Sequence, residues 1–235
     1  MLPILLDPAK FKDVLVTAKG EQRAHVALKS LETLWFNTGT LCNLTCRNCY
    51  IESSPKNDRL VYLSAAEVAS YLDEIEHDRH GTKLIGFTGG EPFMNPELPA
   101  MLDDVLSRGF KVMVLTNAMK PMHKMKRALL DLHQRHGRNL TIRVSVDHYG
   151  PALHERERGL RSWKPTIDGL VWLASNGFDV HVAGRHFSDE SEEDVRAGYH
   201  RLFTELGVAL DAQNSGTLVL FPEICLLYTS DAADE

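Results

Sequence analysis

Short, β-prone apolar runs alternate with helix-like segments along most of this 235-residue chain, and this alternation constrains the fold more than any other feature. The predicted strands cover residues 33–37, 83–88, 111–116, 140–146, 179–183 and 218–221. Helices are expected between them, over about 64–75, 96–107, 122–132, 165–175 and 191–206. Six strands alternating with five helices favour an α/β fold on a parallel sheet. Right-handed crossovers put every helix outside if the sheet curls, or on both faces if it stays open.

The first predicted helix has the clearest local signals. Ser64 followed by Glu67 forms a capping box, which marks the start of a helix. Apolar residues then recur at helical spacing, at Val68, Tyr71, Leu72 and Ile75. The sequence therefore predicts an amphipathic helix directly after the loop that follows the first strand.

Three cysteines, Cys42, Cys46 and Cys49, follow the first predicted strand in a C-x3-C-x2-C pattern. Three thiolates in one loop can bind three irons of a cubane cluster and leave the fourth iron open for a small ligand. A tetrahedral zinc site normally needs a fourth protein ligand. The closest histidines, His25 and His77, are far away in sequence. The spacing therefore favours an iron–sulfur cluster.

A buried helix is the structural alternative, because offsets of 0, 4 and 7 would place all three cysteines on one helical face. Against it, Asn43, Thr45 and Asn48 are poor helix formers, and Gly39-Thr40 precedes them as a turn. A loop is the better interpretation.

The C-x3-C-x2-C pattern after a first strand resembles the signature of the radical S-adenosylmethionine (SAM) superfamily. Thr88-Gly89-Gly90-Glu91-Pro92, after the second predicted strand, resembles the GGEP motif of that family. The resemblance covers roughly residues 33–221. One departure is Asn48, because the family usually has an aromatic residue just before the third cysteine; here the aromatic, Tyr50, comes just after it.

The resemblance implies a [4Fe–4S] cluster held by Cys42, Cys46 and Cys49, with SAM chelated by the open iron. In this family one electron cleaves a carbon–sulfur bond of SAM, giving methionine and a 5′-deoxyadenosyl radical that abstracts hydrogen from a substrate. An external electron donor such as flavodoxin or ferredoxin is implied. The cofactor-binding positions carried over are Gly89, Gly90, Glu91, Pro92, Asn117, Ser145, Asp147 and Arg185. The motifs look most like those of members that modify peptides or build cofactors, but the substrate stays open.

Several of these positions also have an ordinary structural interpretation. Asn117 could form an Asx turn, Asp147 could cap the next loop, and Arg185 could be a surface arginine. For Asn117 and Asp147 the two interpretations carry equal weight. Tyr50 and His148 are candidates for the substrate side.

The last eleven residues, Cys225–Glu235, resemble the translation of a transposase adapter used for sequencing libraries. They are left out of the functional interpretation. Three segments follow: an N-terminal segment (1–32), a radical SAM core domain (33–224) and a non-native tail (225–235). We predict a partial (βα)6 TIM-like barrel of parallel strands with outer helices, its last helix missing.

Composition excludes some functions. A formal net charge of -6 argues against nucleic acid or an anionic membrane as the main partner. No apolar run approaches the ~20 residues that span a bilayer, and no signal peptide is apparent, so the expected location is the cytoplasm. The rival function is a non-catalytic iron–sulfur or zinc module, an electron carrier or scaffold. It would explain the cysteines but not the GGEP motif.

Overall fold

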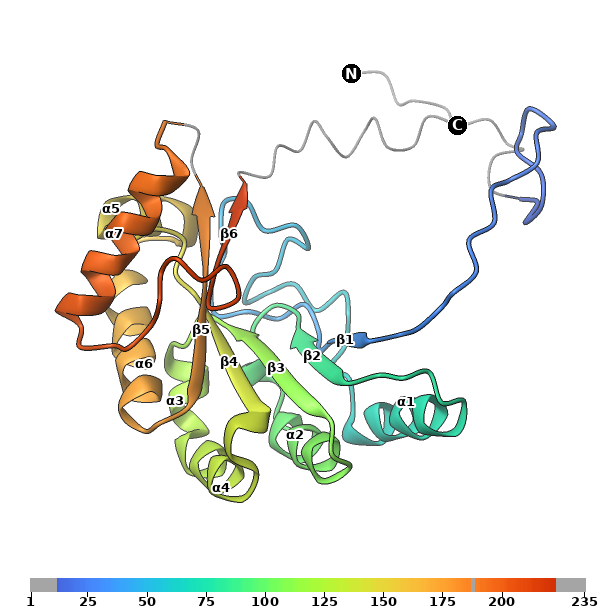
Figure 1. Ribbon diagram of the computed structural model, residues 1–235, viewed down its shortest axis with the longest axis horizontal. Helices are drawn as coiled ribbons and strands as arrows, with labels where there is room; N and C mark the ends of the chain where they lie inside the picture. The colour runs from blue at the N-terminus through green and yellow to red at the C-terminus, as the bar shows by residue number, and fades with distance from the viewer. Residues whose placement is uncertain (1–11, 187–188, 223–235) are drawn as a thin grey trace. The chain divides into compact units, whose positions relative to one another are not determined.

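A computed structural model describes residues 12–186 and 189–222 (Figure 1). The described residues fall into two units, a larger one from residue 31 to residue 222 and a smaller one over residues 12–30. The described part of the second unit contains a tight turn closed by an antiparallel bridge between Val16 and Gln22. The adapter-like tail and the expected loss of a helix after the sixth strand fall outside the described residues.

Among the described residues, the larger unit contains a six-stranded parallel sheet whose strands are ordered as they occur in the chain. The strands are β1 (Thr33–Asn37), β2 (Leu84–Thr88), β3 (Lys111–Thr116), β4 (Leu140–Ser145), β5 (Asp179–His186) and β6 (Leu218–Pro222). Each pairs in parallel with the next. The predicted α/β fold is confirmed, as an open partial barrel in which β1 and β6 are not paired within the described residues.

The longer helices lie along one side of this sheet (Figure 1). They are α1 (Ala65–His77), α2 (Leu98–Ser107), α3 (Lys120–Lys124), α4 (Lys126–His136), α5 (Pro151–Arg158), α6 (Trp163–Ser175) and α7 (Glu192–Glu205). Short 3-10 turns, η1 (Pro92–Met94) and η2 (Gly137–Asn139), precede α2 and β4. The capping box at the start of α1 is present, since Ser64 and Glu67 bond to each other's backbone N–H.

The two faces of the sheet differ because successive side chains on a strand point to opposite sides. The helix-covered face carries the apolar core, including Ile85, Phe87, Val112, Val114, Ile142 and Val144, all without exposed surface. The alternate positions form the inner face, where Trp35, Leu115, Arg143 and Ala183 line a cavity. Polar side chains on that inner face therefore face the cavity, where they can contact a ligand.

Two helical predictions were incomplete. The helix predicted through Met122 and Leu132 is divided at Met125, whose φ of -102° and ψ of 10° end α3 and begin α4. The helix α5 was not predicted, because its buried residues are the polar His154 and Glu157 and so no apolar period appears in the sequence. As described below, α5 is one of the elements that hold the site.

Candidate functional site

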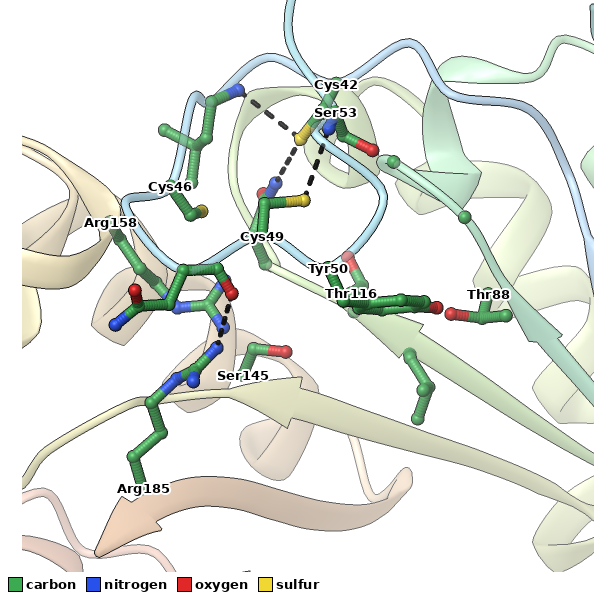
Figure 2. Close-up of a pocket in the computed structure, with 16 residues that line it drawn as sticks. Cys42, Cys46, Cys49, Tyr50, Ser53, Thr88, Thr116, Ser145, Arg158 and Arg185 are labelled. Atoms are coloured by element: carbon green, nitrogen blue, oxygen red, sulfur yellow. Dashed lines mark hydrogen bonds between the residues drawn. The ribbon is translucent and has the colours of Figure 1, made fainter. Parts of the chain in front are cut away.

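The three cysteines lie in a loop that leaves β1 and crosses the carboxyl ends of the strands. Residues 42–49 form no helix, so the alternative of a buried helical face is wrong. Cys42 is buried, and Cys46 and Cys49 are half-buried. All three line one cavity of about 160 Å³, where Figure 2 shows them grouped at one end.

Hydrogen bonds from distant parts of the chain fix this loop. The Cys42 N–H donates to the Ser54 carbonyl at 3.1 Å, which closes the base of the loop. From α5, the Glu157 carbonyl accepts from the Arg47 N–H at 2.8 Å, and its carboxylate accepts from Asn48 Nδ2 at 2.9 Å. These hydrogen bonds connect the loop to Ser54 and to α5.

The sulfur atoms also accept hydrogen bonds. The Leu44 N–H donates to Cys42 Sγ at 3.4 Å, and the Ser53 N–H donates to Cys49 Sγ at 3.2 Å. Burial raises the pKa of Cys42 to about 12 and also raises the pKa of Cys46. Buried thiols with backbone donors are suited to become thiolate ligands when a positive metal centre replaces their protons.

The glycine turn after β2 packs directly against the base of the cysteine loop. A Cβ atom at Gly90 would lie 2.2 Å from the Leu41 carbonyl oxygen, and one at Gly89 would lie 2.7 Å from the Gly39 carbonyl oxygen. The Gly90 N–H donates to Gly39 O at 2.8 Å, and the Glu91 N–H donates to Leu41 O at 3.0 Å. Both glycines also line the cavity. Their small size thus serves loop packing as well as an open cavity wall.

Glu91 and Pro92, the other half of this motif, are buried and are not among the residues that line the described cavity. The Glu91 carboxylate instead accepts hydrogen bonds from Thr116 Oγ1 and the Asn117 N–H, both at 2.8 Å. Pro92 begins the turn η1. The two glycines of the motif therefore line the cavity, whereas Glu91 connects the end of β2 to the end of β3.

Asn117 follows β3, where it forms a turn and lines the cavity. Its Oδ1 accepts from the Met119 N–H at 3.0 Å, which is an Asx turn. Its Nδ2 donates to Asn43 Oδ1 in the cysteine loop at 2.9 Å, and the residue lines the cavity. Ser145, at the end of β4, lines the same cavity from the opposite wall.

Asp147 lies at the centre of a charged cluster and is only 3% exposed. Arg158 Nη2 donates to Asp147 Oδ1 at 2.9 Å, and Arg185 Nε lies 3.6 Å from the same oxygen. Burial alone would raise the pKa of Asp147, but the charge and hydrogen bond of Arg158 outweigh it and hold the pKa below its usual value. Asp147 is thus an ionised partner that positions two guanidinium groups.

These two arginines line the cavity, with Arg158 beside Cys46 (Figure 2). Arg185 Nη2 donates to the Asn48 carbonyl at 3.3 Å. Within the described residues, Arg185 Nη1 and Arg158 Nε are buried atoms without a hydrogen-bond partner. The two arginines share the single carboxylate of Asp147, so a net positive charge remains beside the thiols. This charge would attract an anionic group in the cavity.

Arg158 was not predicted from the sequence. It lies in the charged run His154–Arg158 of α5, which looks like an ordinary solvated helix face. Tyr50 lines the cavity as expected for the substrate side, although most of its side chain is exposed. His148 is buried, bonds to Glu190 at 2.9 Å and is not among the residues that line this cavity.

The sequence model of one family, the radical SAM superfamily, matches residues 36–198, more than half of the chain. The chain belongs to the radical SAM superfamily. This match spans the cysteine loop, the glycine turn and every strand end that lines the cavity.

Curated radical SAM relatives are similar over part of the chain. The antilisterial bacteriocin subtilosin biosynthesis protein AlbA of Bacillus subtilis is 31% identical over 143 residues, which is 60% of this chain and 30% of AlbA. The 7-carboxy-7-deazaguanine synthase of Aquifex aeolicus is 33% identical over 93 residues, 39% of each chain. The matched regions span 30% to 42% of the length of the curated relatives.

Solved structures share the fold of this chain. Streptococcus suis SuiB bound to S-adenosylmethionine superposes with a TM-score of 0.62 at 16% identity, covering 87% of this chain and 53% of SuiB. Methylornithine synthase superposes with a TM-score of 0.58 at 12% identity, covering 82% of this chain and 53% of that one. The partial barrel of β1–β6 therefore has the same fold as these two proteins.

The family uses a [4Fe–4S] cluster and SAM, and the donor set here fits that pair. A cubane needs three thiolates directed at three separate irons, whereas a single zinc ion needs its ligands to converge on one point. Among the described residues, no three His, Cys, Asp or Glu side chains converge on a single-ion site. The cavity beside the thiols is also lined by the glycine turn and by two arginines, each with a buried nitrogen that has no hydrogen-bond partner among the described residues. Within the described ranges, no helix has the length and apolar character needed to cross a bilayer.

Proposed function

We propose that this chain binds a [4Fe–4S] cluster through Cys42, Cys46 and Cys49 and binds SAM beside it, to start radical chemistry on a separate substrate. One observation carries the proposal: the three thiols share a single cavity with the glycine turn and with the polar carboxyl ends of β3, β4 and β5. A non-catalytic cluster module would have no need of that polar wall.

Roles for the wall residues follow from their contacts. The backbone of Gly89 and Gly90 lines the cavity and faces the methionine end of SAM. Arg185 pairs with its carboxylate through the free Nη1, and Asn117 and Ser145 offer hydrogen bonds from neighbouring strand ends. Asp147 orients Arg185 and Arg158. Glu91 and Pro92 act through the position of the turn. Asp147, Glu91 and Pro92 are thus positioning residues.

A bound cluster of this family supplies one electron that breaks a carbon–sulfur bond of SAM, giving methionine and a 5′-deoxyadenosyl radical. We propose an external one-electron donor such as flavodoxin or ferredoxin as the source of that electron, as membership of the family implies. Three free, closely grouped thiols suit a reducing compartment, which supports a cytoplasmic location.

For the substrate we propose a peptide or a cofactor precursor. The support is the likeness to AlbA, named for bacteriocin biosynthesis, and to a probable GTP 3′,8-cyclase of Sulfolobus acidocaldarius, 25% identical over 146 residues. The fold is also that of SuiB, which has been solved bound to the precursor peptide SuiA.

The test uses anaerobically reconstituted protein. We expect about four irons per chain for one cubane, a reduced paramagnetic resonance signal that changes when SAM is added, and 5′-deoxyadenosine formation with dithionite. Cys46→Ala should lose the cluster signal and the deoxyadenosine. Cys225→Ala is the matched control, since it removes one thiol outside the loop and should change neither. Zinc in place of iron, or a normal cluster in Cys46→Ala, would contradict the assignment.

A further inference from the structure

A second cavity of about 290 Å³ lies on the inner face of the sheet and opens into the first. The two cavities share the lining residues Tyr50, Thr88, Leu115, Ser145, Arg158 and Arg185. A molecule in the second cavity would therefore lie directly beside anything bound near the cysteines. Such a position suits a substrate rather than the cofactor.

Aromatic side chains form much of the wall of this second cavity. Trp35 on β1 lies flat against Gly86, since a Cβ at position 86 would come within 2.2 Å of the indole ring. Trp35 is nevertheless 43% exposed, and Phe221 on β6 is 47% exposed. Large apolar rings left this accessible inside a barrel offer a surface for a planar or apolar group.

Arg143 on β4 places a cation against the same cavity. Its Nη2 has only long contacts, 3.4 Å to His181 Nδ1 and 3.3 Å to the Gly216 carbonyl. Its Nε is buried without a hydrogen-bond partner in the described residues. Burial lowers the pKa of Arg143, which is the direction expected when no neighbouring carboxylate stabilises the charge.

Other arginines of the described chain show what is missing at Arg143. Arg158 is paired with Asp147, and Arg108 is paired with three carboxylates, those of Asp73, Glu76 and Asp104. No carboxylate of the described residues lies within 4.0 Å of the Arg143 guanidinium. A partly buried guanidinium without a carboxylate partner is a site where a ligand carboxylate would be stabilised.

We propose that Arg143 binds a carboxylate of the substrate while an apolar or aromatic part of the same molecule packs against Trp35 and Phe221. The role as a substrate site rests on the proposed function. The binding of an aromatic carboxylate is independent of the proposed function, because every contact invoked is made by side chains of the protein and none by the cluster. The planar guanidinium fork matches a carboxylate better than the point charge of a lysine does.

The first experiment compares two probes of nearly equal shape, para-fluorobenzoate and para-fluorobenzamide, by fluorine NMR on the chain without cluster. We expect the carboxylate to bind about tenfold more tightly than the amide, the factor that about 1.4 kcal/mol of charge-assisted hydrogen bonding gives. Arg143→Met should abolish this preference, and Arg143→Lys should retain part of it. Arg127→Met, on the exposed face of α4, is the matched control and should leave the preference unchanged.

A second measurement separates a binding role from a structural one. Because no carboxylate loses its partner, Arg143→Met should leave the melting temperature of the ligand-free chain unchanged or raise it. A lowered melting temperature would mean that Arg143 is a structural group. Equal binding of the two probes, absence of carboxylate binding, or an unchanged preference in Arg143→Met would each overturn the proposal. Failure of the cluster or deoxyadenosine assays would contradict the proposed function and leave these binding results standing.

Discussion

At the scale of single residues, Glu91 shows how a motif residue can act through the fold. Its carboxylate accepts hydrogen bonds from Thr116 Oγ1 and from the N–H groups of Phe93 and Asn117. Desolvation outweighs these bonds and raises its pKa to about 7. A side chain that the sequence suggests as a cofactor contact thus becomes a titrating group inside the protein.

This raised pKa predicts a specific dependence of stability on pH. Between about pH 4.5 and about pH 7 the folded chain holds a proton on Glu91 that the unfolded chain has released, so stability falls as pH rises through that window. The full difference is about 3 kcal/mol, from about 1.4 kcal/mol per unit of pKa. Urea unfolding at several pH values measures how the free energy of unfolding changes with pH. Glu91→Gln should reduce this change, and the exposed Glu74→Gln should leave it as it is. An unreduced pH dependence in Glu91→Gln would refute the prediction.

At the scale of elements, the glycine turn and the cysteine loop form one packed unit. The turn donates two backbone hydrogen bonds to Gly39 and Leu41, and there is no space for side chains at positions 89 and 90. Small changes in the turn should therefore be transmitted to the sulfur positions.

Gly90→Ala tests this coupling. The added methyl group would meet a backbone carbonyl at 2.2 Å, so the loop must shift, at a cost of about 1–3 kcal/mol for an overpacked site. We expect a lower urea midpoint and reduced iron retention after reconstitution. Gly216→Ala is the matched control, because its added methyl would meet only the side-chain oxygen of Asn214, at 3.1 Å. Full iron retention in Gly90→Ala would show that the loop is independent of the turn.

The elements also show how far the sequence could be interpreted. Strands with strong apolar character, such as β1 and β3, are found where they were predicted, because their burial leaves a plain signal. The helix α5 has no such apolar signal in the sequence, since it buries His154 and Glu157 and contacts the loop through polar bonds. Arg158 was not predicted for the same reason. Roles that depend on a pairing between distant polar residues cannot be inferred from one-dimensional spacing.

At the scale of the whole molecule, the fold brings every cavity residue to one edge of the larger unit. The residues come from the loop after β1, from the carboxyl ends of β2 to β5, where parallel strands place their polar ends together, and from the end of α5. The apolar core on the helix side needs no group at this edge to be complete. Folding and cofactor binding are therefore connected mainly through the loop.

We accordingly expect the chain to fold without a cluster and to be stabilised when it binds one. A ligand present at 100 times its dissociation constant adds about 2.7 kcal/mol to the free energy of unfolding. The reconstituted protein should unfold at a higher urea concentration than the chelator-treated protein, with circular dichroism of the two nearly equal. Cys46→Ala should remove the difference. A chelated chain without helical signal would contradict this expectation.

The anchoring of the cysteine loop has a consequence for synthesis on the ribosome. Asn48 is held by Glu157, 109 residues later, and by Arg185, 137 residues later. The three thiols leave the exit tunnel long before either anchor has been translated. The complete pocket can exist only after β5 has emerged, so loading with iron and sulfide is expected to follow translation of this segment and not to accompany the first appearance of the cysteines.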